Sequence, residues 1–332
     1  MLALAQQLIE KRREAIAAGA GVSVPAFDGS RDGLDEKVQF LTDQLNALQR
    51  DHGKLQQAIF EAAQIQRQLC APRELTWSEY EVAGEIFPVR HLSGDFFKVT
   101  KIGDELAIIL GDIAGKGFTA GIWQAHLMGL IQRAAKKHAN PADAIAEVNR
   151  ELCCDENEPP IMALFFARID QKNNLVYCNA GLPAPLLLKG NRPLERLNNG
   201  GPMLGAMKDA QFETGSVMLN PGDMVVAYSD GVTECRNVAD EEFEMERLIA
   251  AITAVGGANA SKALFSLLGT VLDFAESATP ADDLTLLVIR RRGAILAQEQ
   301  PSARKRNSSA SRRRQASIPR SKNSVGGGPV SK

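Results

Sequence analysis

The sequence predicts an α+β fold in which a β-sandwich is covered by helices. Two observations carry this prediction: segments with strand character fall into two blocks along the chain, and segments with helical character come in pairs. An alternation of single strands and helices would instead indicate a parallel sheet built from βαβ units. With 332 residues, the chain is long enough for one domain of about 200 residues plus flanking segments.

The N-terminal part is predicted to be helical. Residues 1–19 have an amphipathic helical pattern, and residues 20–33 are rich in small residues and turn formers, which indicates a linker. A heptad pattern follows in residues 34–70 and indicates a long helix. Its two seam positions are occupied by Leu34, Leu41, Leu48, Leu55, Ala62 and Leu69, and by Val38, Leu45, His52, Ile59 and Gln66.

These heptads favour a two-stranded parallel coiled coil, because leucine at one seam position and branched residues at the other are typical of such dimers. We therefore expect a homodimer through the helix from Leu34 to Leu69, with the polar residues His52 and Gln66 fixing its register. Gly53 weakens the middle of this helix by about 1 kcal/mol. The alternative is a single amphipathic helix that packs on the chain's own globular domain.

The globular domain is expected at residues 71–292. Its strands are expected at residues 81–89, 96–100, 106–110, 161–169, 175–179, 185–189, 212–218, 224–228 and 284–290. Its helices are expected at residues 118–138, 141–154, 242–255 and 261–277, with Pro141 at the first position of the second helix.

Residues 293–332 are expected to be a disordered basic tail, because few apolar residues and a high net charge do not support a packed core. From Arg290 to Lys332 there are 12 Lys and Arg residues against one acidic residue. Without interleaved aromatic residues the tail has no stacking platform, so no dedicated nucleic-acid binding is expected. It offers a contact for an acidic partner or a phosphorylation site in RRRQAS, or it has no defined role.

Composition indicates a cytoplasmic protein. The five cysteines show no CxxC spacing and therefore indicate reduced thiols. The N-terminus has no pattern of a signal peptide, and no apolar run reaches the roughly 18 residues that a membrane span needs.

The central feature of the sequence is a set of aspartates, each directly before or directly after a strand-like run and next to a turn or a glycine. They are Asp95, Asp112, Asp230, Asp282 and Asp283. Turn chemistry explains any one of them alone. Together, carboxylates at the ends of buried strands repel one another unless a cation meets them. The set therefore predicts one convergent site of oxygen ligands for Mg²⁺ or Mn²⁺.

Seven short motifs lie in the order in which a known family has them. They are SGDFF (93–97), GDIAGKG (111–117), NAG (179–181), GGPMLG (200–205), PGD (221–223), YSDGVTE (228–234) and DDLT (282–285). Over about residues 64 to 291 the chain resembles the SpoIIE/RsbU-type bacterial branch of the metal-dependent protein phosphatase 2C-like (PPM) family. The resemblance implies an α-β-β-α sandwich, with two central antiparallel sheets flanked by helices, and a protein phosphatase active on phosphoserine and phosphothreonine.

The resemblance also implies a binuclear centre with two Mn²⁺ or Mg²⁺ ions. Asp112 would bridge both ions, and Asp95 would bind one of them. Asp230 and Asp282 would bind the other, and the carbonyl of Ile113 would add a backbone ligand. Two such ions lower the pKa of a shared water enough to give hydroxide at neutral pH, which would attack the phosphoryl group directly. The carboxylates of Asp95, Asp112 and Asp230 are thus the expected catalytic groups.

Three further residues are candidates for the same site, each with an alternative role. Asp283 either binds a third metal ion or forms hydrogen bonds. Lys116, between two glycines, either binds phosphate or is a surface lysine on a turn. His91 either acts as a general acid or packs in a strand.

Three residues depart from the family's pattern. Lys98 stands where aspartate is usual, Leu182 replaces a histidine, and Met162 stands where threonine is common. None of them is an expected metal ligand, so we expect activity to persist. Protonation of the leaving group and affinity for the substrate stay open.

The expected role is in bacterial partner-switching signalling, because members of this branch often dephosphorylate small antagonist proteins of anti-sigma kinases. The substrate would be a phosphorylated anti-sigma factor antagonist of the STAS type, and the helix from Leu34 to Leu69 would be a regulatory lever. The alternative is a catalytically weak or inactive pseudophosphatase that acts as a coiled-coil signalling adaptor. The retained aspartates favour the enzyme, while Leu182 and Lys98 give slight support to the adaptor.

Overall fold

A computed structural model describes residues 31–69, 73–89, 92–115, 117–154, 159–190 and 192–293. The chain divides into two units, residues 1–293 and 294–332, and all described residues belong to the first. The helix expected at residues 1–19 and the basic tail beyond residue 293 lie outside the described residues, as do His91 and Lys116.

Two sheets form the centre of the first unit. One has the strand order β1-β2-β12-β11-β7-β8 and the other β10-β6-β5-β4-β3, with β9 beside β6. The strands of the first sheet are β1 (Glu74–Trp77), β2 (Tyr80–Phe87), β12 (Leu284–Arg291), β11 (Met224–Tyr228), β7 (Leu186–Leu188) and β8 (Glu195–Arg196). Those of the second are β10 (Gly215–Met218), β6 (Asn174–Ala180), β5 (Met162–Ile169), β4 (Glu105–Ile113), β3 (Phe96–Ile102) and β9 (Gly200–Gly201). Neighbouring strands are antiparallel except the pair of β6 and β9.

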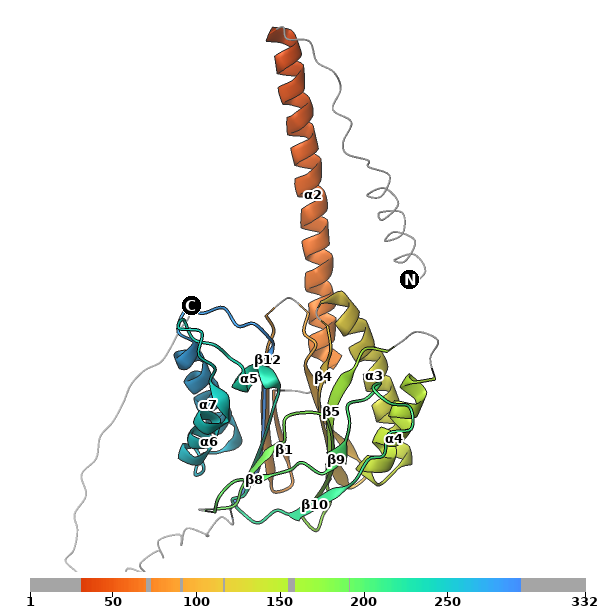
Figure 1. Cartoon of the computed structure of the whole chain (residues 1–332), viewed down its shortest axis with the longest axis vertical. Coiled ribbons are helices and arrows are strands. Elements are labelled where there is room, and N and C mark those ends of the chain that lie inside the picture. Colours follow the sequence, from red (N-terminus) through yellow and green to blue (C-terminus); the bar gives the residue numbers. More distant parts are fainter. Residues whose placement is uncertain are drawn as a thin grey trace, which may run out of the picture. The chain divides into compact units, whose positions relative to one another are not determined.

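Helices cover the outer face of each sheet (Figure 1). The helices α3 (Phe118–Lys137) and α4 (Pro141–Leu152) pack on the sheet of β3 to β6. The helices α6 (Glu244–Ala254) and α7 (Ala260–Ala275) pack on the other sheet. One apolar core lies between the two sheets, and one lies under each pair of helices. The predicted α-β-β-α sandwich is confirmed.

The central strands read as continuous apolar runs because both of their faces are buried. All eight residues of β5 are buried. Phe165 points into the core between the sheets, whereas its neighbour Phe166 points into the core under α3 and α4. Because successive side chains of a strand point to opposite faces of the sheet, β5 contributes residues to two cores.

Several short elements were not expected from the sequence. The strands β1, β8 and β9 and the one-turn helix α5 (Asp230–Thr233) are too short to show a periodic pattern. The strand expected at residues 212–218 is present only as Gly215–Met218, because Phe212 packs against the core under α3 and α4 instead of extending the ladder. Residues 31–33, expected in the linker, belong to the helix α2 (Arg31–Leu69).

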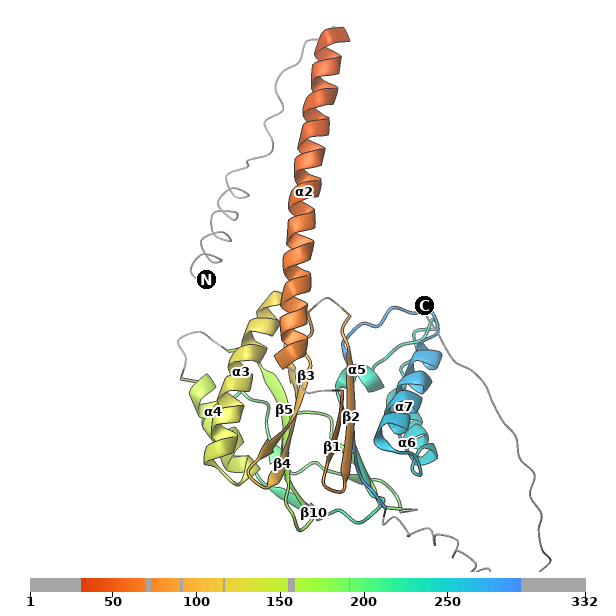
Figure 2. The same ribbon diagram turned by 180° about the vertical axis from the view of Figure 1, so that it is seen from behind.

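The helix α2 is 39 residues long, and both ribbon views show it as one continuous helix (Figures 1 and 2). Most of its apolar seam is exposed, and the exposed seam residues are Leu34, Val38, Leu41, Leu45, Leu48 and Leu55. Near its C-terminal end, Ala63 and Gln66 are buried. Gln66 contacts the chain's own domain, so its expected place in a dimer seam is wrong. No helix among the described residues is both long and apolar enough to cross a membrane.

Phe165 is fully buried in the core between the sheets, and its ring centroid lies 5.8 Å from that of Tyr177. Removing its side chain should therefore lower the stability of the fold strongly. We expect Phe165→Ala to lower the free energy of unfolding by about 3–5 kcal/mol, because it leaves a cavity in the core. Urea denaturation followed by circular dichroism measures this loss. The matched control is Phe265→Ala on α7, where the side chain is 60% exposed, and equal effects of the two variants would contradict the assignment.

Candidate metal centre

The topology brings the predicted carboxylates to one end of the sandwich. Asp95 precedes β3 and Asp112 is near the end of β4, and these two strands are antiparallel neighbours in one sheet. Asp230 follows β11 and Asp282 precedes β12, and these strands are antiparallel neighbours in the other sheet. Each sheet therefore contributes carboxylates to the same end.

Side-chain hydrogen bonds join the two sheets at this end. The hydroxyl of Thr285 donates to Oδ2 of Asp95 at 2.6 Å, and the hydroxyl of Ser93 donates to Oδ2 of Asp283 at 2.7 Å. Asp95 is only 3% exposed. A buried carboxylate needs such donors, because each one offsets part of the cost of removing the charge from water.

The carboxylates raise one another's pKa values. Burial, followed by the negative charge of Asp230, raises the pKa of Asp112 to about 6. Burial and then the charge of Asp112 raise the pKa of Asp95 well above its ordinary value, although hydrogen bonds from Ser229 and Thr285 oppose the shift. This end of the sandwich therefore holds negative charge that the surrounding protein compensates only in part.

The chemistry of these donors suits a hard divalent cation. Every candidate side-chain ligand offers carboxylate oxygen, which Mg²⁺ and Mn²⁺ prefer, and a cation would relieve the repulsion that raises the pKa values. Among the described residues, no group of three or more His, Cys, Asp or Glu side chains has an arrangement that could hold a metal ion as it stands. The structure gathers the carboxylates at one end of the sandwich.

Asp283 forms three hydrogen bonds to protein donors, which is one of the two roles that the sequence left open; its binding of a third metal ion stays a prediction. Its Oδ1 accepts from the amide of Val89 at 2.7 Å, and its Oδ2 accepts from the amide of Gly94 at 2.9 Å and from the hydroxyl of Ser93. Both oxygens are thus bound to protein donors. Asp283 ties the segment before β3 to the start of β12 and so connects the two sheets.

Gly94 permits the close approach of the two segments that carry Asp95 and Asp112. A Cβ atom at Gly94 would meet the carbonyl oxygen of Ile113 at 2.8 Å and Oδ1 of Asp112 at 3.3 Å. The carbonyl oxygen of Ile113 therefore lies near Oδ1 of Asp112, and its role as a backbone ligand stays a prediction. Gly231 has the same role on the other sheet, since its Cβ would meet the carbonyl oxygen of Asp283 at 2.1 Å.

The other residues singled out in the sequence lie elsewhere or outside the described residues. Leu182 is buried in the core between the sheets, where an apolar side chain suits its surroundings. Met162 is fully buried in β5. The structure describes neither Lys116 nor His91.

Thr285 and Ser93 are the site residues that the sequence did not assign. Thr285 is fully buried in β12, between the apolar residues Leu284 and Leu286. A buried hydroxyl needs a hydrogen-bond partner. A threonine in an apolar run is therefore the only sequence signal that could have indicated the role of Thr285. The role of Ser93 depends on a contact with Asp283, 190 residues away, and no local pattern indicates it.

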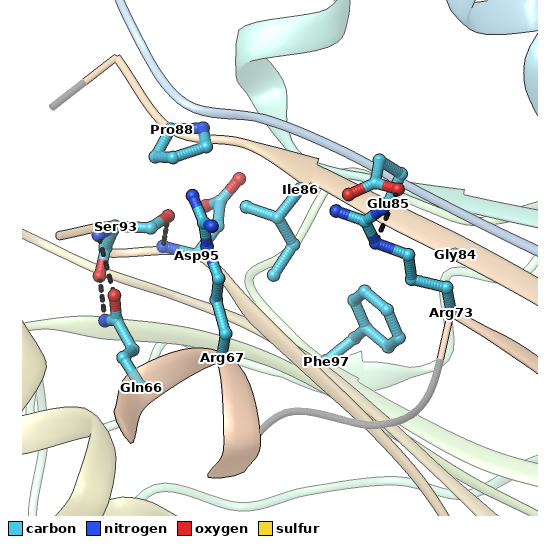
Figure 3. A pocket seen from close by; sticks show the side chains of 10 residues that line it. All are labelled: Gln66, Arg67, Arg73, Gly84, Glu85, Ile86, Pro88, Ser93, Asp95 and Phe97. Carbon is cyan, nitrogen blue, oxygen red and sulfur yellow. Dashed lines mark hydrogen bonds and ion pairs between the residues drawn. The ribbon is translucent and has the colours of Figure 1, made fainter. Parts of the chain in front are cut away.

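A cavity of about 110 Å³ lies beside Asp95 (Figure 3). Its walls come from the end of α2, from β2 and from the start of β3. Gln66 and Arg67 line it on the helix side, and Ser93, Asp95 and Phe97 line it on the strand side. The end of α2 is therefore adjacent to the candidate centre.

The chain matches one protein-family model and is similar to several known proteins. The model described as stage II sporulation protein E (SpoIIE) matches residues 102–292. Protein IcfG from Synechocystis sp. is 26% identical over 284 residues, which are 76% of this chain and 43% of IcfG. Phosphoserine phosphatase RsbU from Bacillus subtilis is 25% identical over 235 residues, which are 70% of this chain and 69% of RsbU. The chain thus spans less than half of the length of IcfG.

The fold also has a close counterpart among solved structures. The SiaA-PP2C domain of Pseudomonas aeruginosa superposes with a TM-score of 0.65 at 18% sequence identity. The match covers 72% of this chain and 98% of that domain. At this identity the likeness establishes the sandwich fold.

The raised pKa of Asp112 predicts that its charge destabilises the metal-free protein. The folded pKa of about 6 lies above the ordinary value of 3.8. The penalty is therefore full above about pH 6 and disappears as the pH falls below the ordinary value. We expect Asp112→Asn to raise the melting temperature at pH 7.5 in the presence of a chelator, by the equivalent of at most about 3 kcal/mol.

Thermal unfolding between about pH 4 and 8 checks this prediction. The gain from Asp112→Asn should shrink as the pH falls. Asp209→Asn, a change of the same kind at an exposed position, serves as the control. A melting temperature of Asp112→Asn at or below that of the unsubstituted protein at pH 7.5 would contradict the proposed charge repulsion.

Proposed function

Because the chain belongs to the family of the stage II sporulation protein E (SpoIIE) model, we propose that it is a metal-dependent protein phosphatase acting on phosphoserine or phosphothreonine. The observation that carries the proposal is the gathering of Asp95 and Asp112 from one sheet with Asp230 and Asp282 from the other. The name of its relative RsbU, a phosphoserine phosphatase, supports the substrate class.

In this proposal the carboxylates hold two divalent ions, Mn²⁺ or Mg²⁺. Asp112 would serve both ions, Asp95 would serve one, Asp230 and Asp282 would serve the other, and the carbonyl of Ile113 would add a ligand. When bound, such ions supply a water of lowered pKa and positive charge for the phosphoryl oxygens. The reaction requires no covalent intermediate between the phosphoryl group and the protein.

The surrounding residues of the chain have positioning roles in this proposal. Thr285 orients Asp95 by donating to its Oδ2. Asp283 holds the segment before β3 through Ser93 and Gly94. Burial of Asp95 keeps bulk water away from its carboxylate and strengthens its interaction with a cation.

We further propose a role in partner switching, with a phosphorylated anti-sigma factor antagonist of the STAS type as the protein substrate. The resemblance of the motifs to the SpoIIE/RsbU branch supports this role. Regulation would act through α2, whose C-terminal end lies beside Asp95. A change in the pairing or rotation of α2 would then alter metal occupancy.

A phosphatase assay tests the proposed function. We expect the full chain to hydrolyse p-nitrophenyl phosphate and a phosphoserine peptide in the presence of Mn²⁺. Asp112→Asn should lower turnover by at least about a thousandfold, because it removes the shared ligand. Asp209→Asn should leave turnover unchanged. Absence of metal-dependent turnover in the unsubstituted chain would favour the pseudophosphatase adaptor instead.

The exposed seam of α2 leads us to propose a homodimer through this helix. Leu41 and Leu48 are 48% and 67% exposed, and a second copy of the seam would bury them in a parallel coiled coil. We expect the double variant Leu41→Lys/Leu48→Lys to be monomeric in light scattering, with the unsubstituted chain dimeric. The matched control, Gln39→Lys/Asn46→Lys, adds the same charge outside the seam and should stay dimeric; a monomeric unsubstituted chain would refute the dimer.

A further inference from the structure

One residue of α2 is bonded directly to the segment that carries Asp95. Nε2 of Gln66 donates to the carbonyl oxygen of Ser93 at 2.7 Å, and the amide of Ser93 donates to Oε1 of Gln66 at 3.1 Å. The side-chain amide of Gln66 thus pairs with both backbone groups of Ser93, as a neighbouring strand would (Figure 3). Gln66 is only 9% exposed.

A second bond fixes the orientation of this amide. Nε2 of Gln66 also donates to Oε1 of Gln124 on α3, which is 1% exposed. The donor and acceptor ends of Gln66 are therefore both assigned, and the amide has one orientation that satisfies all its partners. An apolar side chain of the same size would leave the buried backbone groups of Ser93 without these bonds.

Ser93 is in turn hydrogen-bonded to Asp95 and Asp283. Its hydroxyl accepts from the amide of Asp95 at 3.0 Å and donates to Asp283 at 2.7 Å. The adjacent Gly94 amide also donates to Asp283. The segment from Ser93 to Asp95 is thus held from two sides, by Gln66 from α2 and by Asp283 from the start of β12.

We propose that Gln66 is a positioning residue for the metal position served by Asp95. The inference rests on the proposed function, because it concerns the same centre. Gln66 fixes the backbone of Ser93, and Ser93 in turn fixes the amide of Asp95, so that its carboxylate faces Asp112. Outer groups that orient a metal ligand typically change metal affinity by about 10- to 100-fold when they are removed.

The neighbouring Gln68 provides a matched control. It lies two residues away on the same helix and is exposed. Among the described residues, no hydrogen bond or ion pair of its side chain is present. Gln66→Leu and Gln68→Leu therefore make the same chemical change, and only the first removes a contact with Ser93.

Calorimetric titration of the chelator-stripped full chain with MnCl₂ tests the proposal. We expect Gln66→Leu to bind Mn²⁺ at least about tenfold more weakly than the unsubstituted chain, and Gln68→Leu to bind within twofold of it. A merely structural role of Gln66 predicts a lower melting temperature with unchanged Mn²⁺ affinity, and that result would overturn the proposal.

The remaining outcomes are also decisive. If Gln66→Leu does not fold, Gln124→Leu removes the bond that orients the amide and should weaken Mn²⁺ binding in the same direction; unchanged binding in that variant overturns the proposal. If the unsubstituted chain takes up no Mn²⁺, the proposed function fails and this inference falls with it. If that chain binds Mn²⁺ and Gln66→Leu binds it equally well, the inference alone fails.

Discussion

Like charges placed together in a buried site are the constraint on which the rest of this structure depends. Asp95 and Asp112 come from one sheet and Asp230 and Asp282 from the other, so the charges meet only if the two sheets are held in a fixed relation. The apolar core between the sheets supplies that relation, and the hydroxyl of Thr285 and the carboxylate of Asp283 connect the sheets at the site itself. The fold thus holds together groups that repel each other, which is how functional sites commonly depart from maximal stability.

The helix α2 has two different parts. Its N-terminal part carries an apolar seam that no residue of the described chain covers, whereas its C-terminal end is bonded to Ser93 and Gln124. A helix is a stiff element, so an event at one part changes the position of the other without needing a separate relay. This arrangement gives the proposed dimer a physical route to the carboxylates.

The sequence was sufficient to predict the sandwich, because strands buried on both faces, such as β5, leave continuous apolar runs. It was also sufficient to single out the aspartates, since a charge directly after such a run is costly. It failed where structure depends on distant contacts. The heptads placed Gln66 in a seam, but Ser93 and Gln124 bind its amide. Short elements such as β1 have no periodic pattern in the sequence. The hydrogen bond from Thr285 to Asp95 could not be predicted, because it forms only when the two sheets are packed together.

The bond between Thr285 and Asp95 spans 190 residues of the chain, and this separation has a consequence for biosynthesis. Asp95 and Asp112 leave the ribosome early, together with the strands that pair them. The hydroxyl that supports Asp95 and the carboxylate that ties down the preceding segment follow only when β12 has been made. The full set of donors that supports Asp95 is therefore absent from a nascent chain until Thr285 has been made, and closure of the sandwich by its last strand is the step that completes the site.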